Sequence, residues 1–228
     1  MKYLMLIVMV AISSAPAFAA SNFLGGMSGM ILTPDNVIIP HATGEASFHE
    51  SVEAVNGENL NAWGLNYGVA QGLEAGLSVL SSGGRKDVAI NGKYQMIREN
   101  ESSPAVLVGV FDAAGLADTI NGDASIYILA SKNITSMVSQ IGCPPANPFR
   151  LNLGVGSGVY NGVFGGVDWT ASSRWRVMAE YTNGEFADER NLVNVGVRYA
   201  VADKWRLDAG LLKFKRFAFG VGFRTAFD

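Results

Sequence analysis

The chain has 228 residues, of which 49% are apolar and 16% charged, against roughly 25% charged in an average soluble domain. This composition excludes intrinsic disorder, and its 27 glycines follow no G-X-Y period, which excludes collagen. A net charge of −3 without a run of Lys or Arg argues against nucleic acid as a partner. One Cys and two His provide neither a disulfide framework nor a zinc motif, so we expect no metal and no cofactor.

The first residues have the layout of a secretory signal peptide. Lys2 precedes an apolar run over residues 3–12, and Ala17-Phe18-Ala19 is a small-x-small cleavage site. We predict cleavage after Ala19. The apolar run is shorter than the 20 or so residues that a membrane-spanning helix needs, and no later stretch reaches 18 apolar residues. A role in the membrane would therefore depend on strands, which must close into a barrel.

Four stretches near the C-terminus alternate between apolar residues and polar or small ones, which predicts β-strands with one apolar face. They span 175–182, 193–200, 205–212 and 217–228. All seven of their charged side chains fall on one face, and none falls on the other.

The same alternation, in a looser form, predicts eight further strands. They are Glu45–Val55, Asn61–Val69, Leu73–Leu80, Val88–Met96, Ala105–Phe111, Ser125–Ser131, Arg150–Ser157 and Val163–Trp169. The sequence thus predicts an all-β fold of about twelve strands, or ten. A soluble sheet also has one apolar face, so alternation alone does not decide between membrane and water.

Three further features favour a transmembrane antiparallel up-and-down β-barrel. The polar face is rich in glycine, which suits a tightly curved wall; these are Gly76, Gly154, Gly156, Gly196, Gly210, Gly220 and Gly222. Aromatic residues lie on the apolar face near strand ends, where lipid headgroups would meet them; these are Tyr67, Trp175, Tyr181, Tyr199 and Trp205. The last strand reaches an aromatic residue, Phe227, as in bacterial outer-membrane barrels.

Loop lengths suit a barrel whose two termini lie in the periplasm. The connections 69–72, 170–174 and 201–204 would be short periplasmic turns, and the longer loops 112–123 and 183–189 would lie outside. The long connection 133–148, which contains Cys143, would hold a short helix or irregular structure. We therefore divide the chain into a signal peptide (1–19), an N-terminal segment that could enter the lumen as a plug (20–43) and the barrel (44–228).

Three places in the sequence resemble the YjbH-like outer-membrane β-barrel family, which is associated with bacterial exopolysaccharide production. They are residues 29–36 with Pro40 and Gly44, residues 153–158 leading into 163–167, and residues 179–181 with 194–199. The resemblance implies an outer-membrane barrel and a link to exopolysaccharide export.

Catalytic chemistry has little support in the sequence. His49 is followed by Glu50, but neighbours in a strand point to opposite faces, so Glu50 cannot orient His49. No G-x-S-x-G motif is present. Cys143 is interpreted as a loop thiol without a role. We expect no enzyme activity and no catalytic residue, with an outer-membrane hydrolase as a distant alternative.

Charged residues on the inward face form the one constellation with a physical role. They are Arg176, Glu180, Arg198, Arg206, Asp208 and Arg224. They could line a polar pore that binds anionic sugars, since the guanidinium group matches carboxylate geometry. They could instead form an ion-pair network that fills the lumen, in which Arg198 and Arg206 pair with Glu180 and Asp208. The second interpretation is slightly favoured.

These observations predict a non-enzymatic, porin-like protein of the bacterial outer membrane with a structural or passage role. Its expected partners are outer-membrane lipid, the barrel-assembly machinery through the C-terminal strand, and an anionic polysaccharide. The alternative is a secreted soluble β-barrel that binds an apolar ligand, with the two faces inverted.

Overall fold

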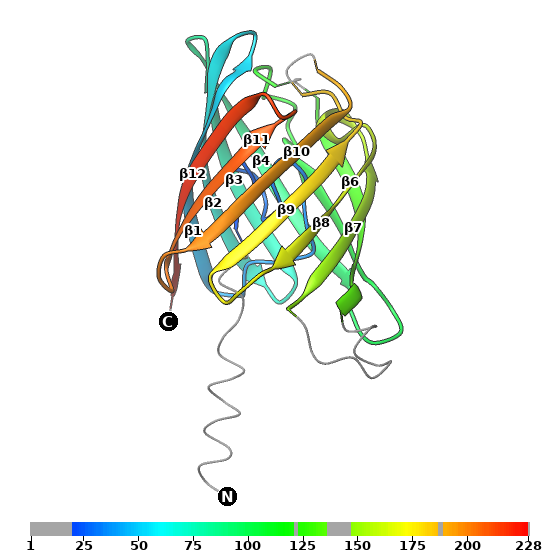
Figure 1. Cartoon of the computed structure of the whole chain (residues 1–228). Coiled ribbons are helices and arrows are strands. Elements are labelled where there is room, and N and C mark those ends of the chain that lie inside the picture. Colours follow the sequence, from blue (N-terminus) through cyan, green and yellow to red (C-terminus); the bar gives the residue numbers. More distant parts are fainter. Residues whose placement is uncertain (1–19, 121–122, 136–146, 187–188, 228) are drawn as a thin grey trace, which may run out of the picture.

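The computed structural model describes residues 20–120, 123–135, 147–186 and 189–227. Twelve strands in these residues form one closed barrel (Figure 1). They are β1 (Thr43–Val55), β2 (Glu58–Ala70), β3 (Leu73–Ser82), β4 (Arg85–Ile97), β5 (Ala105–Phe111), β6 (Ser125–Asn133), β7 (Phe149–Gly156), β8 (Gly162–Thr170), β9 (Trp175–Thr182), β10 (Leu192–Ala200), β11 (Trp205–Leu212) and β12 (Arg216–Ala226).

Every strand pairs antiparallel with its neighbours in sequence, and β12 pairs with β1 to close the ring. This confirms the predicted fold class and the count of twelve. The first strand begins earlier than predicted, at Thr43, because Thr43 still pairs with Ala226 of β12. The predicted signal peptide and Cys143 lie outside the described residues.

The two faces of the wall point as the alternation predicted. Large apolar side chains cover the outside, among them Leu65 at 63% exposure and Ile126 at 62%, while the charged residues of β9–β11 are buried inside. An apolar exterior around a polar interior is the arrangement of a barrel that crosses a membrane. It contradicts the soluble alternative, in which the apolar face would point inward.

Aromatic residues lie at the strand ends of this exterior, as predicted. Trp175 and Tyr199 stack 4.5 Å apart, and Trp205 packs 4.8 Å from Phe223. β1 begins and β12 ends at one end of the barrel, which we call the terminal end. At the opposite end, loop residues Ala117 and Ile120 and the short 3-10 helix η1 (Gly158–Tyr160) pack into the ring. In the described part of the chain, no helix is long and apolar enough to cross a membrane.

Candidate functional site in the barrel lumen

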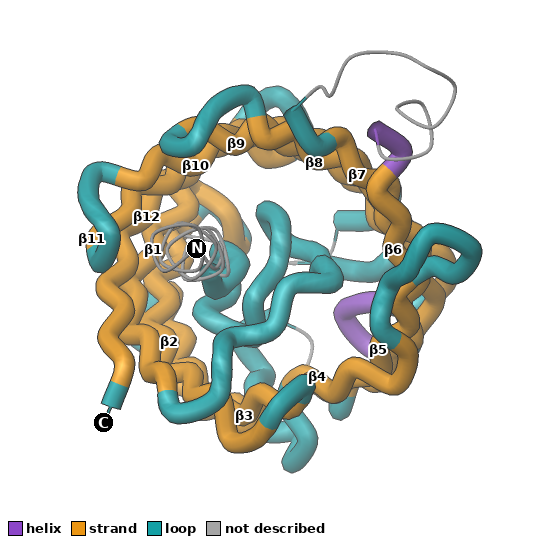
Figure 2. Tube along the Cα trace, turned by 90° about the horizontal axis from the view of Figure 1, so that it is seen from below, coloured by secondary structure: helices purple, strands orange, loops and turns teal. Residues whose placement is uncertain are grey.

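Residues 20–42, which we call the lumen segment, lie inside the ring of strands (Figure 2). Every residue from Ala20 to Asp35 is buried. Backbone hydrogen bonds fold the segment back on itself, for example from Phe23 N to Ile31 O at 2.7 Å and from Gly29 N to Ala20 O at 2.8 Å. The segment is therefore a compact unit, and its contacts with the wall decide whether the lumen is open.

Glu180 of β9 holds the middle of the lumen segment. Its carboxylate accepts hydrogen bonds from the backbone amides of Ile31 (3.1 Å), Leu32 (2.7 Å) and Thr33 (3.1 Å). The Thr33 hydroxyl and the side-chain amide of Asn194 donate to the same carboxylate at 2.8 and 2.9 Å. A buried carboxylate with this many donors is well compensated for the water that it has lost.

Glu74 of β3 and Lys93 of β4 hold a second part of the segment. Glu74 accepts from the amides of Ser28 (2.7 Å) and Ile39 (3.0 Å) and from the Ser28 hydroxyl (2.6 Å). The Lys93 ammonium donates to the carbonyls of Ser28 (2.6 Å) and Val37 (2.5 Å). The wall thus offers a carboxylate and a cation to the same stretch of backbone.

The start of the segment meets a third group of charges. Glu45 of β1 accepts from the amide (2.8 Å) and hydroxyl (2.5 Å) of Ser21. The same carboxylate pairs with Arg206 at 2.9 Å and with Arg224 at 3.2 Å. Arg198 donates to the carbonyl of Ser21 at 3.1 Å and to that of Gly29 at 3.1 Å.

Asp208 of β11 is the centre of this third group. It lies 2.6 Å from Arg198, 3.1 Å from Arg206 and 3.2 Å from the Nε2 of His49. Arg198 and Asp208 face each other directly in the β10–β11 register. The strand pairing therefore determines this contact.

The structure divides the six predicted lumen residues among separate groups. Arg198, Arg206 and Asp208 lie together, and Arg224 joins them through Glu45. Arg176 lies apart and pairs with Asp35 of the segment at 2.8 Å and with Asp168 at 3.1 Å. The expected pairing of Glu180 with Arg198 or Arg206 is wrong, because the backbone amides of the segment occupy the Glu180 carboxylate.

Sequence reasoning missed Glu45, Glu74, Lys93 and Asp168 in the wall and Asp35 in the segment. The four wall residues occupy inward positions of predicted strands, so a count of charges by face over all twelve strands would have found them. Asp35 has no periodic signal, because it lies in a segment without regular secondary structure.

His49 is buried beside the Phe23 ring, with 4.9 Å between ring centroids, and bonds to Asp208. Among the described residues, no hydroxyl bonds to His49, and its Nδ1 has no hydrogen-bond partner. No group of three or more potential metal ligands occurs in that part of the chain. The His49–Asp208 pair therefore belongs to the charge network.

A cavity of about 770 Å³ opens at the terminal end, between the lumen segment and the wall. Residues 36–41 line one side, and the other side carries Gln71, Gln95, Arg98, Arg150 and Arg176. Arg150 is paired with Glu99 and Arg176 with Asp35, whereas Arg98 is exposed and forms no ion pair within the described ranges. This mouth is polar, basic and accessible.

One protein-family model matches the chain, over residues 159–228. The matched family is YjbH. Its description is "Exopolysaccharide biosynthesis protein YbjH". The predicted resemblance to YjbH is confirmed over these residues, which contain the late-strand motifs 179–181 and 194–199; the motifs at 29–44 and 153–158 lie outside the matched range. No curated protein matches the sequence at a significant level.

Solved structures with the same fold are porins. One, titled "KdgM porin", superposes with a TM-score of 0.54 at 11% identity over 82% of this chain and 99% of the other. A second, "KdgM porin in complex with disordered oligogalacturonate", gives 0.52 at 11% identity over the same shares. A third, an outer-membrane channel from Pseudomonas putida F1, gives 0.46 at 12% identity over 87% of this chain and 100% of the other. The YjbH-matching chain is thus a porin-like barrel whose apolar exterior suits the bacterial outer membrane.

Proposed function

We propose that this protein is an outer-membrane passage protein whose lumen segment closes the barrel at rest and leaves the lumen when cargo passes. One observation carries the proposal: the wall charges hold the segment mainly by its backbone. Glu74 and Glu180 accept from amides, and Lys93 and Arg198 donate to carbonyls. Such contacts can be replaced by water or by the hydroxyl groups of a cargo, whatever its sequence.

Polysaccharide is the cargo class that we favour. The YjbH family description names exopolysaccharide biosynthesis, and one porin of similar fold carries oligogalacturonate in its title. With the segment displaced, the wall would present carboxylates, guanidinium groups and the Lys93 ammonium, which suit hydroxylated or acidic sugars. The basic cavity at the terminal end would be the first contact for an anionic chain.

The proposal does not require catalysis. The two neighbours with TM-scores above 0.5 are porins, and the buried His49–Asp208 pair has no nucleophile beside it in the described residues. We infer a non-enzymatic protein that is surrounded by outer-membrane lipid and is recognised during assembly through β12.

A second candidate, a permanently closed structural barrel, is favoured by a different observation. Apolar side chains of the segment also pack in the lumen, and Phe23, Leu24, Met30 and Ile31 are each at most 1% exposed. Displacing the segment would expose these side chains to water, at a cost of about 1.5 to 3 kcal/mol for each large side chain.

Conductance in planar bilayers separates the two candidates. We expect the wild type to be silent and Glu180→Ala to conduct, because this substitution removes the acceptor of three segment amides. Glu50→Ala is the matched control, since Glu50 instead binds Asn59 near the end of β1. Migration of unheated and boiled samples on a denaturing gel would verify folding.

A wild type that conducts steadily would show that the segment does not close the lumen. A folded Glu180→Ala variant that stays silent would favour the permanently closed barrel.

A further inference from the structure

The β11–β12 hairpin, at the end opposite the termini, exposes an aromatic ring between cations. Phe214 is 62% exposed and stands between Lys213 and Lys215, with Arg216 next in sequence. Lys213 and Phe214 have φ angles of 53° and 55°, in the left-handed region that favours Gly or Asn. A turn that keeps two such residues in a rarely populated conformation points to a function for the side chains that it presents.

This hairpin carries a net positive charge. The Lys213 ammonium lies 3.4 Å from the Glu189 carboxylate, and the Arg216 guanidinium lies 3.0 Å from it. Lys215 is exposed and forms no ion pair in the part of the chain that the structure describes. Three cations therefore face one carboxylate, which leaves charge to attract an anion.

An apolar groove of about 540 Å³ begins beside the same hairpin and crosses the outer wall. Leu211 and Phe217 face each other at its start, next to the cations. It continues over Val195, Ala179 and Val167, which face one another in the strand register, to Trp169 near the terminal end. Ala179 and Ala209 are smaller than their outward neighbours and form its floor.

We infer that the hairpin and this groove together bind one anionic, phosphate-bearing membrane lipid. The phosphate would lie among Lys213, Lys215 and Arg216, since basic residues at a membrane surface attract anionic headgroups. Phe214 would lie at headgroup level, as aromatic residues do in barrels. One acyl chain would fill the groove, whose lining is nearly all apolar. The site lies outside the lumen, so it is independent of the proposed passage function.

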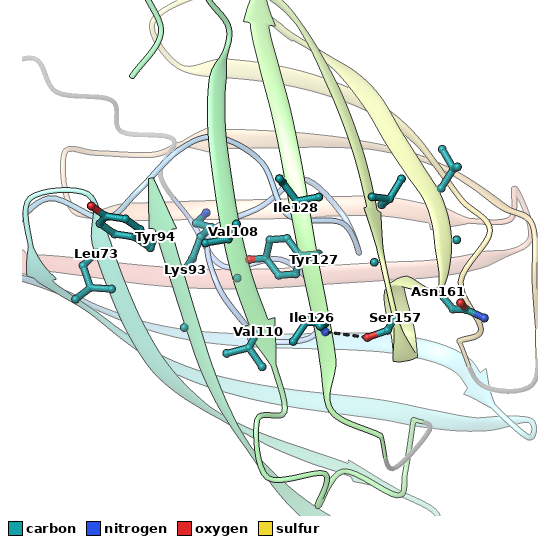
Figure 3. A pocket seen from close by; sticks show the side chains of 16 residues that line it. Leu73, Lys93, Tyr94, Val108, Val110, Ile126, Tyr127, Ile128, Ser157 and Asn161 are labelled. Carbon is teal, nitrogen blue, oxygen red and sulfur yellow. Dashed lines mark hydrogen bonds between the residues drawn. The ribbon is translucent and has the colours of Figure 1, made fainter. Parts of the chain in front are cut away.

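A larger groove on the other side of the barrel provides an internal comparison (Figure 3). It has a volume of about 900 Å³ and is lined on the outer face by Val108, Ile126 and Ile128. Lys93 also borders it, but its ammonium is bonded inside the lumen to Ser28. Residues 105–131 and 151–170 contain no Lys or Arg, so this groove lacks a headgroup site.

Native mass spectrometry of the full-length barrel in detergent tests the inference, with phosphatidylglycerol and phosphatidylcholine as probes. We expect the wild type to retain phosphatidylglycerol preferentially. The triple variant Lys213→Gln, Lys215→Gln, Arg216→Gln should lose about fivefold in affinity per removed charge. Ala179→Phe, which fills the groove, should also reduce retention. Gly92→Phe, which fills the comparison groove, should leave it unchanged.

Equal retention of both lipids by the wild type would overturn the inference. So would undiminished phosphatidylglycerol retention in the folded triple variant or in Ala179→Phe. Displacement of phosphatidylglycerol by an equal concentration of inorganic phosphate would show that the cations bind a free anion, and would overturn the lipid assignment.

Discussion

The Nε2 atom of His49 on β1 lies 3.2 Å from the Oδ2 atom of Asp208 on β11, although β12 runs between these two strands. Gly220 of β12 faces both residues in the strand register. A Cβ atom on Gly220 would collide with the His49 ring. The missing side chain therefore allows two strands that are not neighbours to share an ion pair inside the wall.

Gly220→Ala should lower the free energy of unfolding by about 1 to 3 kcal/mol, the usual cost of overpacking. Urea unfolding of the detergent-solubilised barrel measures this. A second substitution, His49→Ala, should remove part of the penalty because it removes the obstructing ring. Gly92→Ala is the control, since the nearest atom to its added Cβ is 3.7 Å away. Equal effects of the two alanines would show that Gly220 is not a space-saving position.

The hydroxyls of Ser21 and Ser47 lie 3.1 Å apart and join the lumen segment to β1. This spacing suits a disulfide, whose Cβ atoms are typically about 3.8 Å apart. In a Cys143→Ser background, Ser21→Cys with Ser47→Cys should abolish the conductance of Glu180→Ala under oxidising conditions, and a reductant should restore it. Ser21→Cys alone should respond to neither. Conductance through the oxidised, crosslinked barrel would place the ion path elsewhere than along the segment.

Arg198 is completely buried and contacts Asp208 and two segment carbonyls. Removing one partner of a buried ion pair typically costs about 3 to 5 kcal/mol, because the other charge remains without compensation. Arg198→Gln should therefore lower the urea midpoint strongly. Arg190→Gln breaks the exposed pair with Glu185 and should cost about 0.2 to 1 kcal/mol. Similar midpoints for the two variants would contradict the network.

The pKa of the Glu189 carboxyl lies below its usual value. Burial alone would raise this pKa, but the Arg216 guanidinium and the Lys213 ammonium outweigh burial. A lowered folded-state pKa means that the pair stabilises the hairpin above the unfolded pKa of about 4.3, and that this contribution is lost as pH falls through the folded value. Glu189→Gln should therefore destabilise the barrel slightly at pH 7 and not at pH 2. A difference that stays constant across this range would contradict the pairing.

Alternation predicted the barrel because it reports a local property, namely which face of a strand meets lipid. Arg198 and Asp208 could be assigned to one face on that basis alone. Their pairing also needs the register of β10 against β11, which hairpin length restricts. The role of Glu180 could not be predicted in this way, because its partners are backbone amides, which have no signature in the amino-acid sequence.

The contacts between Glu180 and the lumen segment join residues 147 to 149 positions apart in the chain. A chain that is made and exported from its N-terminus therefore presents the segment long before the strand that binds it. Until β9 and β10 arrive, Phe23, Met30 and Ile31 have no wall to pack against and remain available to periplasmic chaperones. Insertion of the segment is thus a late event in biogenesis, and a chain truncated before β9 would leave the segment without its Glu180 anchor.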